Sequence, residues 1–373
     1  MSSVLLDFDP ALALPHEKKP LRDGLSVALR TGDDLWVASD ETTTLERLTQ
    51  VEPGRFARHA RFALADLVDL PGKEDDEIDV EGLGSSDGYL WLTGSHSLTR
   101  KKPKRDRDDA DGMERLATVK DGANRYVLAR VPCVPDASGT HVPSREAELP
   151  PSKDGEAPRR LVAARLDGGK HGNELTRAME DDEHLAPFLE IPGKDNGFDI
   201  EGLAMANGRL FLGLRGPVLR GWAVILSMEL AADADDATVL RLGERRVARD
   251  AKGKKVERAY AKHFIPLGGM GIRELRAVGD DLLVLAGPTM ALDGTIAVFR
   301  WRGGARAECD GIVPADDVQR LFDVPHGTGA DAERDRAEGM TVWSPGELLV
   351  VYDSPGERRL RGEAGVLADV FAL

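Results

Sequence analysis

Residues 70–83 read LPGKEDDEIDVEGL, and residues 191–203 repeat nearly the same phrase as IPGKDNGFDIEGL. A weaker copy, VPHGTGADAERDRAEGM, covers residues 324–340, and a compressed copy, IPLGGMGIREL, covers residues 265–275. Each copy contains a glutamate that leads into an apolar stretch typical of a β-strand. A phrase that recurs along one chain indicates a repeat architecture, in which each repeat is one small structural unit.

The segments around these phrases follow a single plan. After the glutamate come a short apolar strand, a turn such as Asp87-Gly88 or Asn207-Gly208, and a second apolar strand. Asp-Gly and Asn-Gly between apolar runs are strong signals for two-residue β-hairpin turns. Further strands follow; in the first repeat we predict them at Thr43 to Val51 and Arg61 to Leu70. The sequence therefore predicts a series of four-stranded antiparallel sheets.

The last repeat is one strand short after its final apolar stretch, Val366 to Leu373. The apolar stretch Ser3 to Phe8 has no turn partner beside it and could supply the missing strand. These features predict an all-β fold, a β-propeller with five visible blades that is closed by its N-terminal strand. The long interval between Glu81 and Glu201 leaves a sixth blade possible. A β-sandwich is the alternative, because its strands recur at a comparable spacing.

We interpret residues 1–373 as a single propeller domain with polar insertions near residues 99–124 and 134–159. The first insertion begins with the basic run RKKPKRDR at residues 100–107, which acidic residues follow. This run either overhangs the site and steers an anionic ligand or is simply a solvated insertion. The two cysteines, Cys133 and Cys309, are predicted to be unpaired thiols.

The composition excludes several classes of protein. Hydrophobic residues make up 41% of the chain and charged residues 31%, which is typical of a globular protein. A net charge of −15 argues against a general nucleic-acid binder. We find no apolar run long enough to span a membrane and no signal peptide, so we predict no membrane association and a cytoplasmic location. The oligomeric state stays open.

The repeats predict a shared site on one face of the molecule. In an antiparallel hairpin, the start of the first strand and the end of the second meet at the same edge of the sheet. In a propeller this edge surrounds the central channel, where carboxylates would converge. The predicted metal ligands are Asp79, Glu81, Asp199, Glu201, Glu274 and Glu338. Oxygen ligands without a cysteine cluster favour calcium or magnesium.

Other residues at the same edge are candidates for catalysis and substrate binding. His96 follows a second strand and is the predicted general acid or base, and Arg215 is predicted to act beside it on an anionic group. Arg273, Arg276 and Asp353 are the predicted substrate-binding residues. A structural reading stands beside this one. The acids could satisfy backbone donors between sheets, and His96 could be a hydrogen-bonded turn residue.

The phrases DVEGL with GSHS, DIEGL with LRGP, and RAEGM with VVYDS resemble those of a bacterial family of unknown function whose members are predicted propellers. The chain is also distantly similar to esterase-like phytases and to calcium-dependent lactonase and gluconolactonase propellers. This resemblance implies a propeller fold in which acids at strand starts help to bind metal. It transfers only to Glu81, Glu201, Glu274 and Glu338.

Two functional hypotheses follow from these observations. The first is a metal-assisted hydrolase that cleaves an ester, lactone or phosphoester at the carboxylate-rich face. The second is a non-catalytic propeller scaffold that binds a small anionic molecule or a protein partner. The second hypothesis is favoured by the polar insertions and by the lack of a complete catalytic motif.

Overall fold

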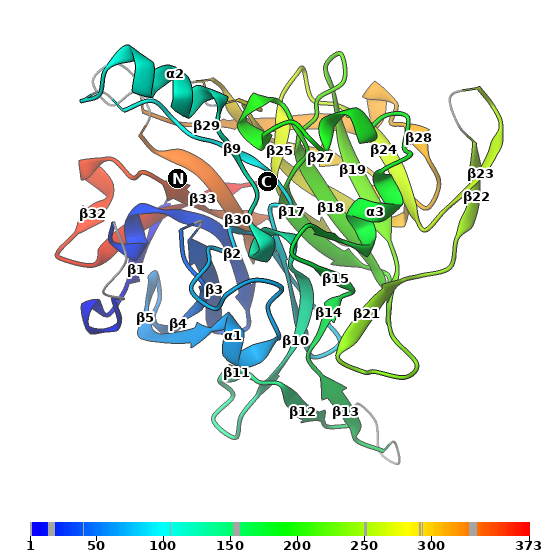
Figure 1. Ribbon diagram of the computed structural model, residues 1–373. Coiled ribbons are helices and arrows are strands. Elements are labelled where there is room, and N and C mark those ends of the chain that lie inside the picture. Colours follow the sequence, from blue (N-terminus) through cyan, green and yellow to red (C-terminus); the bar gives the residue numbers. More distant parts are fainter. Residues whose placement is uncertain are drawn as a thin grey trace.

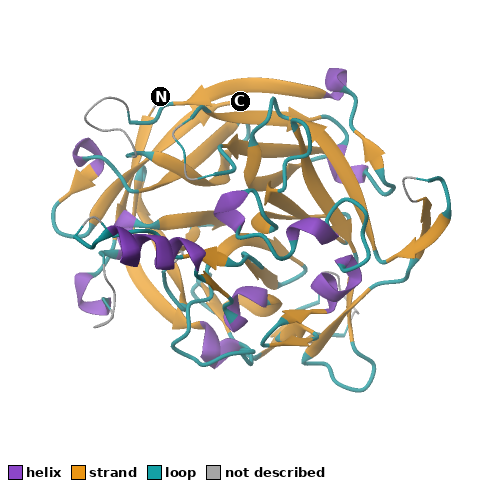
Figure 2. Cartoon of the chain, turned by 45° about the horizontal axis from the view of Figure 1, so that its top comes forward, coloured by secondary structure: helices purple, strands orange, loops and turns teal. Residues whose placement is uncertain are grey.

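The computed structural model of the chain describes residues 2–13, 19–39, 41–104, 106–151, 157–249, 252–290, 292, 294–327 and 334–373. Strands dominate these residues, and the helices are short and lie in the connections between strands (Figure 2). The predicted all-β class is confirmed.

Most of the strands form five groups of four antiparallel strands (Figure 1). The first group contains β2 (Leu25–Thr31), β3 (Asp34–Ser39), β4 (Thr44–Glu52) and β5 (Arg55–Ala63). The second contains β6 (Val80–Ser86), β7 (Tyr89–Gly94), β10 (Leu128–Pro135) and β14 (Ala164–Leu166). The third contains β17 (Asp199–Ala206), β18 (Arg209–Gly216), β19 (Trp222–Met228) and β24 (Tyr260–Pro266). The fourth contains β25 (Gly271–Val278), β26 (Asp281–Gly287), β27 (Ile296–Trp301) and β29 (Val318–Val324), and the fifth contains β30 (Arg336–Ser344), β31 (Glu347–Asp353), β33 (Gly365–Ala372) and β1 (Ser2–Asp7).

The remaining elements lie in the connections. The predicted first insertion contains β8 (Thr99–Arg100), α2 (Asp109–Ala117) and β9 (Val119–Lys120), and the second contains β11 (His141–Pro143), β12 (Glu146–Leu149) and part of β13 (Arg159–Val162). The others are α1 (Leu64–Leu67), β15 (Gly168–Gly169), β16 (Gly172–Asn173), α3 (Glu174–Met179), β20 (Leu230–Ala232), β21 (Val239–Leu242), β22 (Arg246–Arg249), β23 (Lys255–Arg258), β28 (Gly311–Ile312) and β32 (Leu360–Arg361). The β22–β23 hairpin extends away from the body of the molecule (Figure 1). No helix of the described residues is long and apolar enough to cross a membrane.

The predicted hairpin turns are present. Asp87 and Gly88 have φ angles of 54° and 83°, and Asn207 and Gly208 have φ angles of 51° and 75°. Positive φ at both central residues is the requirement of a type I′ turn, which matches the twist of the flanking strands. Short polar residues and glycine adopt this conformation at low cost, so these dipeptides determine the hairpins locally.

One predicted strand is wrong. We expected the fourth strand of the first repeat at Arg61 to Leu70, but β5 covers Arg55–Ala63 and α1 begins at Leu64. The reason is the Pro53-Gly54 turn, in which Gly54 has a φ of 80° and Glu52 pairs with Arg55. A Pro-Gly turn reverses the chain at once, so the next strand starts six residues earlier than the apolar pattern indicated.

Strand β1 joins the two ends of the chain. It pairs antiparallel with β33, from Ser2 opposite Val370 to Asp7 opposite Gly365. It also pairs in parallel with β5, where Leu6 lies opposite Phe56. The fifth group of strands is therefore completed by a segment from the N-terminal region.

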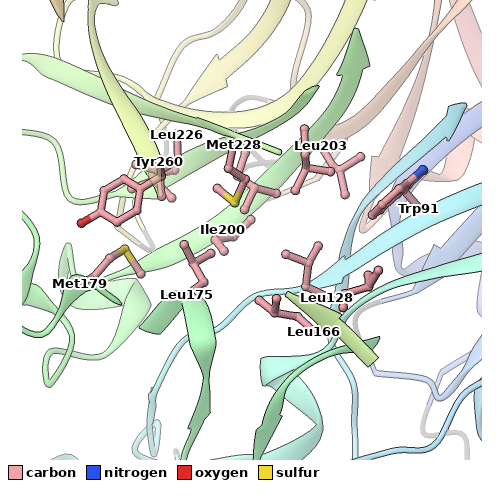
Figure 3. Close-up of a cluster of buried hydrophobic side chains, with 14 of the residues drawn as sticks. Trp91, Leu128, Leu166, Leu175, Met179, Ile200, Leu203, Leu226, Met228 and Tyr260 are labelled. Atoms are coloured by element: carbon pink, nitrogen blue, oxygen red, sulfur yellow. The ribbon is translucent and has the colours of Figure 1, made fainter. Parts of the chain in front are cut away.

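Five clusters of buried apolar side chains occur in the described residues, each between successive groups of strands. Figure 3 shows the cluster between the second and third groups, where Trp91 and Leu128 face Ile200, Leu203 and side chains of β19. A comparable cluster lies between the fifth and first groups. Every group of strands is thus packed on both faces.

We predict that β1 contributes strongly to stability. Leu6 has no exposed surface and packs in the cluster between the fifth and first groups. Leu6→Ala should lower the free energy of unfolding by about 2–5 kcal/mol, because it leaves a cavity in a packed core. Chemical denaturation measures this loss. The matched control is Leu116→Ala at a position that is 47% exposed, where less than about 1 kcal/mol is expected. Equal losses in the two variants would contradict the packing role of β1.

Candidate functional site

The first strand of every group carries a β-bulge near its start. In β6 the pairing moves from Val80 directly to Gly82, so Glu81 is the additional residue. The same shift makes Glu201 the additional residue of β17. The equivalent residues of β2, β25 and β30 are Ser26, Arg273 and Glu338. A bulge redirects the side chain of the additional residue, and four of these five side chains line one cavity.

The glycine that follows the glutamate has a packing role. A Cβ atom on Gly202 would lie 2.9 Å from the backbone nitrogen of Leu275, and one on Gly339 would lie 2.8 Å from that of Ala28. The first strands of neighbouring groups thus approach each other so closely at these two positions that a side chain would clash with the backbone of the next strand. The repeated Glu-Gly pair therefore combines a side chain for the cavity with a close approach between strands.

The cavity has a volume of about 330 Å³. The floor denotes the four bulge residues on this lining together with the charged side chains that contact them or precede them by two residues, and with Arg125 and Glu77 beside Asp79. Of the predicted site residues, the structure brings eight to its lining: Asp79, Glu81, Asp199, Glu201, Arg215, Arg273, Glu338 and Asp353. The prediction that the repeats share one site is therefore consistent with the geometry, whereas the role of each residue stays a prediction.

Arginines neutralise the acids on the floor. Arg215 contacts both Asp199 and Glu201 through its two terminal nitrogens. Arg273 Nη1 lies 2.6 Å from Glu338 Oε1 and 3.8 Å from Glu201 Oε2. These contacts form one chain of alternating charges that runs from the third group of strands to the fifth.

A second part of the floor follows the same pattern. Arg125 Nη1 lies 2.5 Å from Asp79 Oδ2, and its other terminal nitrogen contacts Glu77. Arg125 precedes β10, outside every repeated phrase, and sequence reasoning missed it. No local signal in the sequence links it to Asp79.

Burial changes the protonation of these acids. It raises the pKa of Asp199 and of Glu201, and the pairing with Arg215 only partly offsets this effect. It also raises the pKa of Glu338 to about 7, although Arg273 acts in the opposite direction. Burial alone would lower the pKa of Arg215, but Asp199 and Glu201 more than compensate and raise it. Arg215 is therefore permanently charged, whereas Glu338 can exchange a proton near neutral pH.

Glu274, a predicted metal ligand, and Arg276, a predicted substrate-binding residue, do not line this cavity. Both side chains are buried and pair with each other, with 2.8 Å between Arg276 Nη2 and Glu274 Oε2. The reason is that the glutamate of the copy at residues 265–275 stands one residue later, relative to the bulge, than the glutamate of the other copies. Arg273 takes the bulge position there, and Glu274 takes the position of Gly82 in the second group. The structure thus corrects the roles predicted for both residues.

Arg276 bonds to the first strand of four different groups. Its Nη1 donates to the carbonyls of Leu83 and Leu203, both at 3.0 Å, and to that of Leu275 at 2.6 Å. Its Nη2 donates to the carbonyl of Ala28. These acceptors belong to β6, β17, β25 and β2, so a single guanidinium lies where the first strands converge. Burial raises the pKa of Glu274 to about 8 and lowers that of Arg276, which shows how strongly this pair is desolvated.

His96 is a buried turn residue with a φ angle of 56° and is not part of the cavity lining. Its Nδ1 lies 2.9 Å from the Gly94 carbonyl, and its Nε2 lies 2.7 Å from Asn173 Nδ2. Both contacts suit a neutral ring, in which Nδ1 donates and Nε2 accepts, and burial lowers the pKa of His96 to about 4. The geometry does not support the predicted general acid or base, and favours the structural alternative.

Several cations of the lining were not predicted. Arg336 precedes Glu338 by two residues and occupies the position that Asp79 and Asp199 hold in the clearer copies of the phrase. This Asp-to-Arg replacement is visible in the sequence and is the signal that could have identified it. Lys194, from the lysine of IPGKDNG, also lines the cavity.

The acids of the floor do not fit a calcium or magnesium ion. Asp79, Asp199, Glu201 and Glu338 each contact a guanidinium group, as described above. A divalent cation among them would have to approach Arg125, Arg215 and Arg273, and like charges repel strongly in a buried site. Five of the six predicted metal ligands, namely Asp79, Asp199, Glu201, Glu274 and Glu338, are thus engaged in ion pairs with arginine.

A different group of side chains has the spacing of metal ligands. Among the described residues, Asp182, Glu183 and His184 offer ligand atoms within 4.8 Å of one another. The ammonium group of Lys262 lies 2.8 Å from Asp182, 3.4 Å from Glu183 and 3.0 Å from His184 Nδ1. A buried lysine thus already supplies the positive charge at this cluster, which lies outside the cavity.

We predict that Arg276 is essential for stability. Arg276→Met removes the donors to strands β2, β6 and β17 and leaves Glu274 buried without its partner. The free energy of unfolding should fall by at least about 3 kcal/mol, which chemical denaturation would detect. As a control, Arg300→Met removes a partly exposed guanidinium that lies 3.9 Å from Asp281, and should cost less than about 1 kcal/mol. A loss no larger than that of the control would refute the central role of Arg276.

Comparisons with known proteins place the chain in a family. A search of curated proteins finds no match to this sequence. One similar solved structure is a streptogramin B lyase, with 10% identity over 100% of this chain and 98% of that chain and a TM-score of 0.35. Glutaminyl cyclase from Myxococcus xanthus has 10% identity over 99% of both chains and a TM-score of 0.36. PQQ-bound aldose sugar dehydrogenase from Streptomyces coelicolor has 11% identity over 99% of this chain and 98% of that chain and a TM-score of 0.36. Similarities this weak carry no information about function. Residues 24–369 match the model of the family described as "Protein of unknown function (DUF3616)", so the chain belongs to this family, as its repeated phrases indicated.

Proposed function

We propose that the cavity binds a small molecule that carries an anionic group. The observation that carries this proposal is a set of cations on the lining. Lys102, Lys194, Arg334 and Arg336 line the cavity and form no ion pair within 4.0 Å in the part of the chain that the structure describes, although Lys194 partly offsets, from a longer distance, the rise that burial causes in the pKa of Asp199 and Glu201. Cationic side chains that converge on a cavity without protein partners are suited to an anionic ligand.

The charge balance of the lining supports the same proposal. The whole chain carries a net charge of −15, yet the lining contains eight acidic and eight basic side chains. Burial raises the pKa of four of these acids, namely Glu77, Asp199, Glu201 and Glu338, which reduces the negative charge of the lining. The cavity is therefore far less acidic than the rest of the protein.

We infer that the five groups of strands are the blades of one closed, five-bladed propeller domain. The first strands contact one another in cyclic order, from β2 through β6, β17, β25 and β30 back to β2. The pairing of β1 with β33 and the apolar cluster between the fifth and first groups support closure. A closed ring would bring the five bulges to one end of a common channel.

A second candidate function is hydrolysis of an anionic ester, lactone or phosphoester without a metal ion. The observation that favours it is Glu338, a carboxyl group on the cavity lining with a pKa of about 7. Its ionised form could accept a proton from a water molecule as that water attacks the substrate, and could then return the proton to the leaving oxygen. Arg273, which contacts Glu338, could stabilise the negative charge that develops on the substrate.

We predict that anion binding depends on Arg336. Isothermal titration calorimetry with butyrate should detect binding to the native protein, and the neutral analogue butanol should bind at least about tenfold more weakly. Arg336→Gln should weaken butyrate binding by about tenfold or more. The control Arg245→Gln removes an exposed charge that does not line the cavity and should leave the affinity unchanged. Equal affinities in the two variants would exclude Arg336 as an anion ligand.

If the cavity is catalytic, Glu338 should control turnover. The hydrolysis rate of a panel of anionic esters, lactones and phosphoesters should rise as the pH increases through about 7, because the base must be ionised. Glu338→Gln should reduce the rate by about a hundredfold or more and remove this pH dependence. Glu347→Gln, on β31 and outside the cavity lining, is the matched control. If no substrate in the panel is hydrolysed, hydrolysis of these three substrate classes is excluded, and the proposal that the cavity binds an anionic molecule is unaffected.

A further inference from the structure

One wall of the cavity is apolar. It is built from Pro288, Met290 and Leu292 between β26 and β27 and from Ile296 at the start of β27. Ile296 is buried, whereas Met290 is 44% exposed and Leu292 is 63% exposed. Large apolar side chains with this much exposure are few among the described residues, and these two both line the charged cavity. Exposed apolar surface next to a cavity often marks a binding site.

The apolar wall adjoins the charged floor directly. Arg273 Nη2 lies 3.4 Å from the Pro288 carbonyl, and the same guanidinium contacts Glu338 through Nη1. The side chains of Arg273 and Ile296 both pack against Gly287. A Cβ atom at this position would lie 2.8 Å from Arg273 Nε and 3.4 Å from Ile296 Cγ1. The cavity therefore offers a cationic region and an apolar region that meet at Arg273.

We propose that the ligand is a carboxylate with a short aliphatic chain. This proposal rests on the anion-binding function proposed above and specifies the class of ligand. The carboxylate would contact Arg336 and Lys194, and the chain would cover Met290, Leu292 and Ile296. A fully polar anion would leave the apolar wall in water, and a neutral apolar molecule would leave the cations without a partner. The volume of about 330 Å³ is at the lower end of the roughly 300–1,000 Å³ typical of small-molecule sites, which suits a compact ligand.

The test is the affinity of a series of straight-chain carboxylates, namely acetate, butyrate, hexanoate and octanoate, measured by calorimetry at constant ionic strength. Each methylene that enters the apolar region should tighten binding by about fourfold, until the chain outgrows the wall. Hexanol should bind at least about tenfold more weakly than hexanoate, because it lacks the anionic group.

Substitutions on the wall separate the two regions of the site. Met290→Ser and Leu292→Ser should each flatten the dependence on chain length and leave the affinity for acetate nearly unchanged. The matched control is Ile312→Ser, which changes an apolar side chain that is 68% exposed but does not line the cavity, and which should leave the whole series unchanged. Circular dichroism of each variant verifies that it is folded.

The outcomes distinguish this proposal from the one on which it rests. If all four carboxylates bind with equal affinity, and Arg336→Gln weakens them equally, the aliphatic ligand class is refuted and the anion site stands. If hexanol binds as tightly as hexanoate, the carboxylate is refuted as the recognised group. If none of the carboxylates binds to the native protein, both proposals fail for this class of anion.

Discussion

The structure depends on one buried guanidinium, that of Arg276, where the first strands of the sheets converge. It donates to backbone carbonyls of β2, β6, β17 and β25 and pairs with the buried carboxylate of Glu274. Carbonyls that point toward a shared centre would otherwise face one another without donors, which is costly in a site without water. Gly202 lies against the backbone of Glu274 and Leu275, so its lack of a side chain lets these two first strands approach closely. The pair therefore constrains both the spacing of the strands and the residues that can face them.

A second constraint is the bulge at the start of each first strand. It adds one residue beyond the regular pairing and directs Glu81, Glu201, Arg273 and Glu338 to one cavity. The copy that places an arginine rather than a glutamate at this position changes the chemistry of the whole site. Arg273 lies between Glu201 and Glu338 and contacts both. One departure from the repeat thus turns a row of acids into an alternating set of charges.

Internal cations recur wherever acids gather in this protein. Arg215 contacts Asp199 and Glu201, Arg276 contacts Glu274, and Lys262 lies among Asp182, Glu183 and His184. In each case a side chain supplies the positive charge that a metal ion could otherwise provide. Such pairs are expensive to desolvate, and the loss of one partner is costly because it leaves the other charge buried without compensation. Four carboxylates of the cavity, namely Asp79, Asp199, Glu201 and Glu338, are therefore each paired with an arginine.

Local sequence signals were enough to predict the hairpin turns at Asp87-Gly88 and Asn207-Gly208, the strands around them, the strand near Ser3 to Phe8, and the position of eight candidate residues near the ends of strands. These follow from backbone conformation and from the alternation of side chains along a strand, which depend on neighbouring residues only. The tertiary structure alone decided which acids are neutralised, because Arg125 reaches Asp79 from 46 residues away. It also decided that Glu274 turns inward and that His96 is enclosed by Asn173 and Tyr126. A bulge shifts by one residue which side chains point to each face of the sheet, and burial depends on side chains from other sheets. The orientation of Glu274 and the enclosure of His96 could therefore not be predicted from the repeated phrase alone.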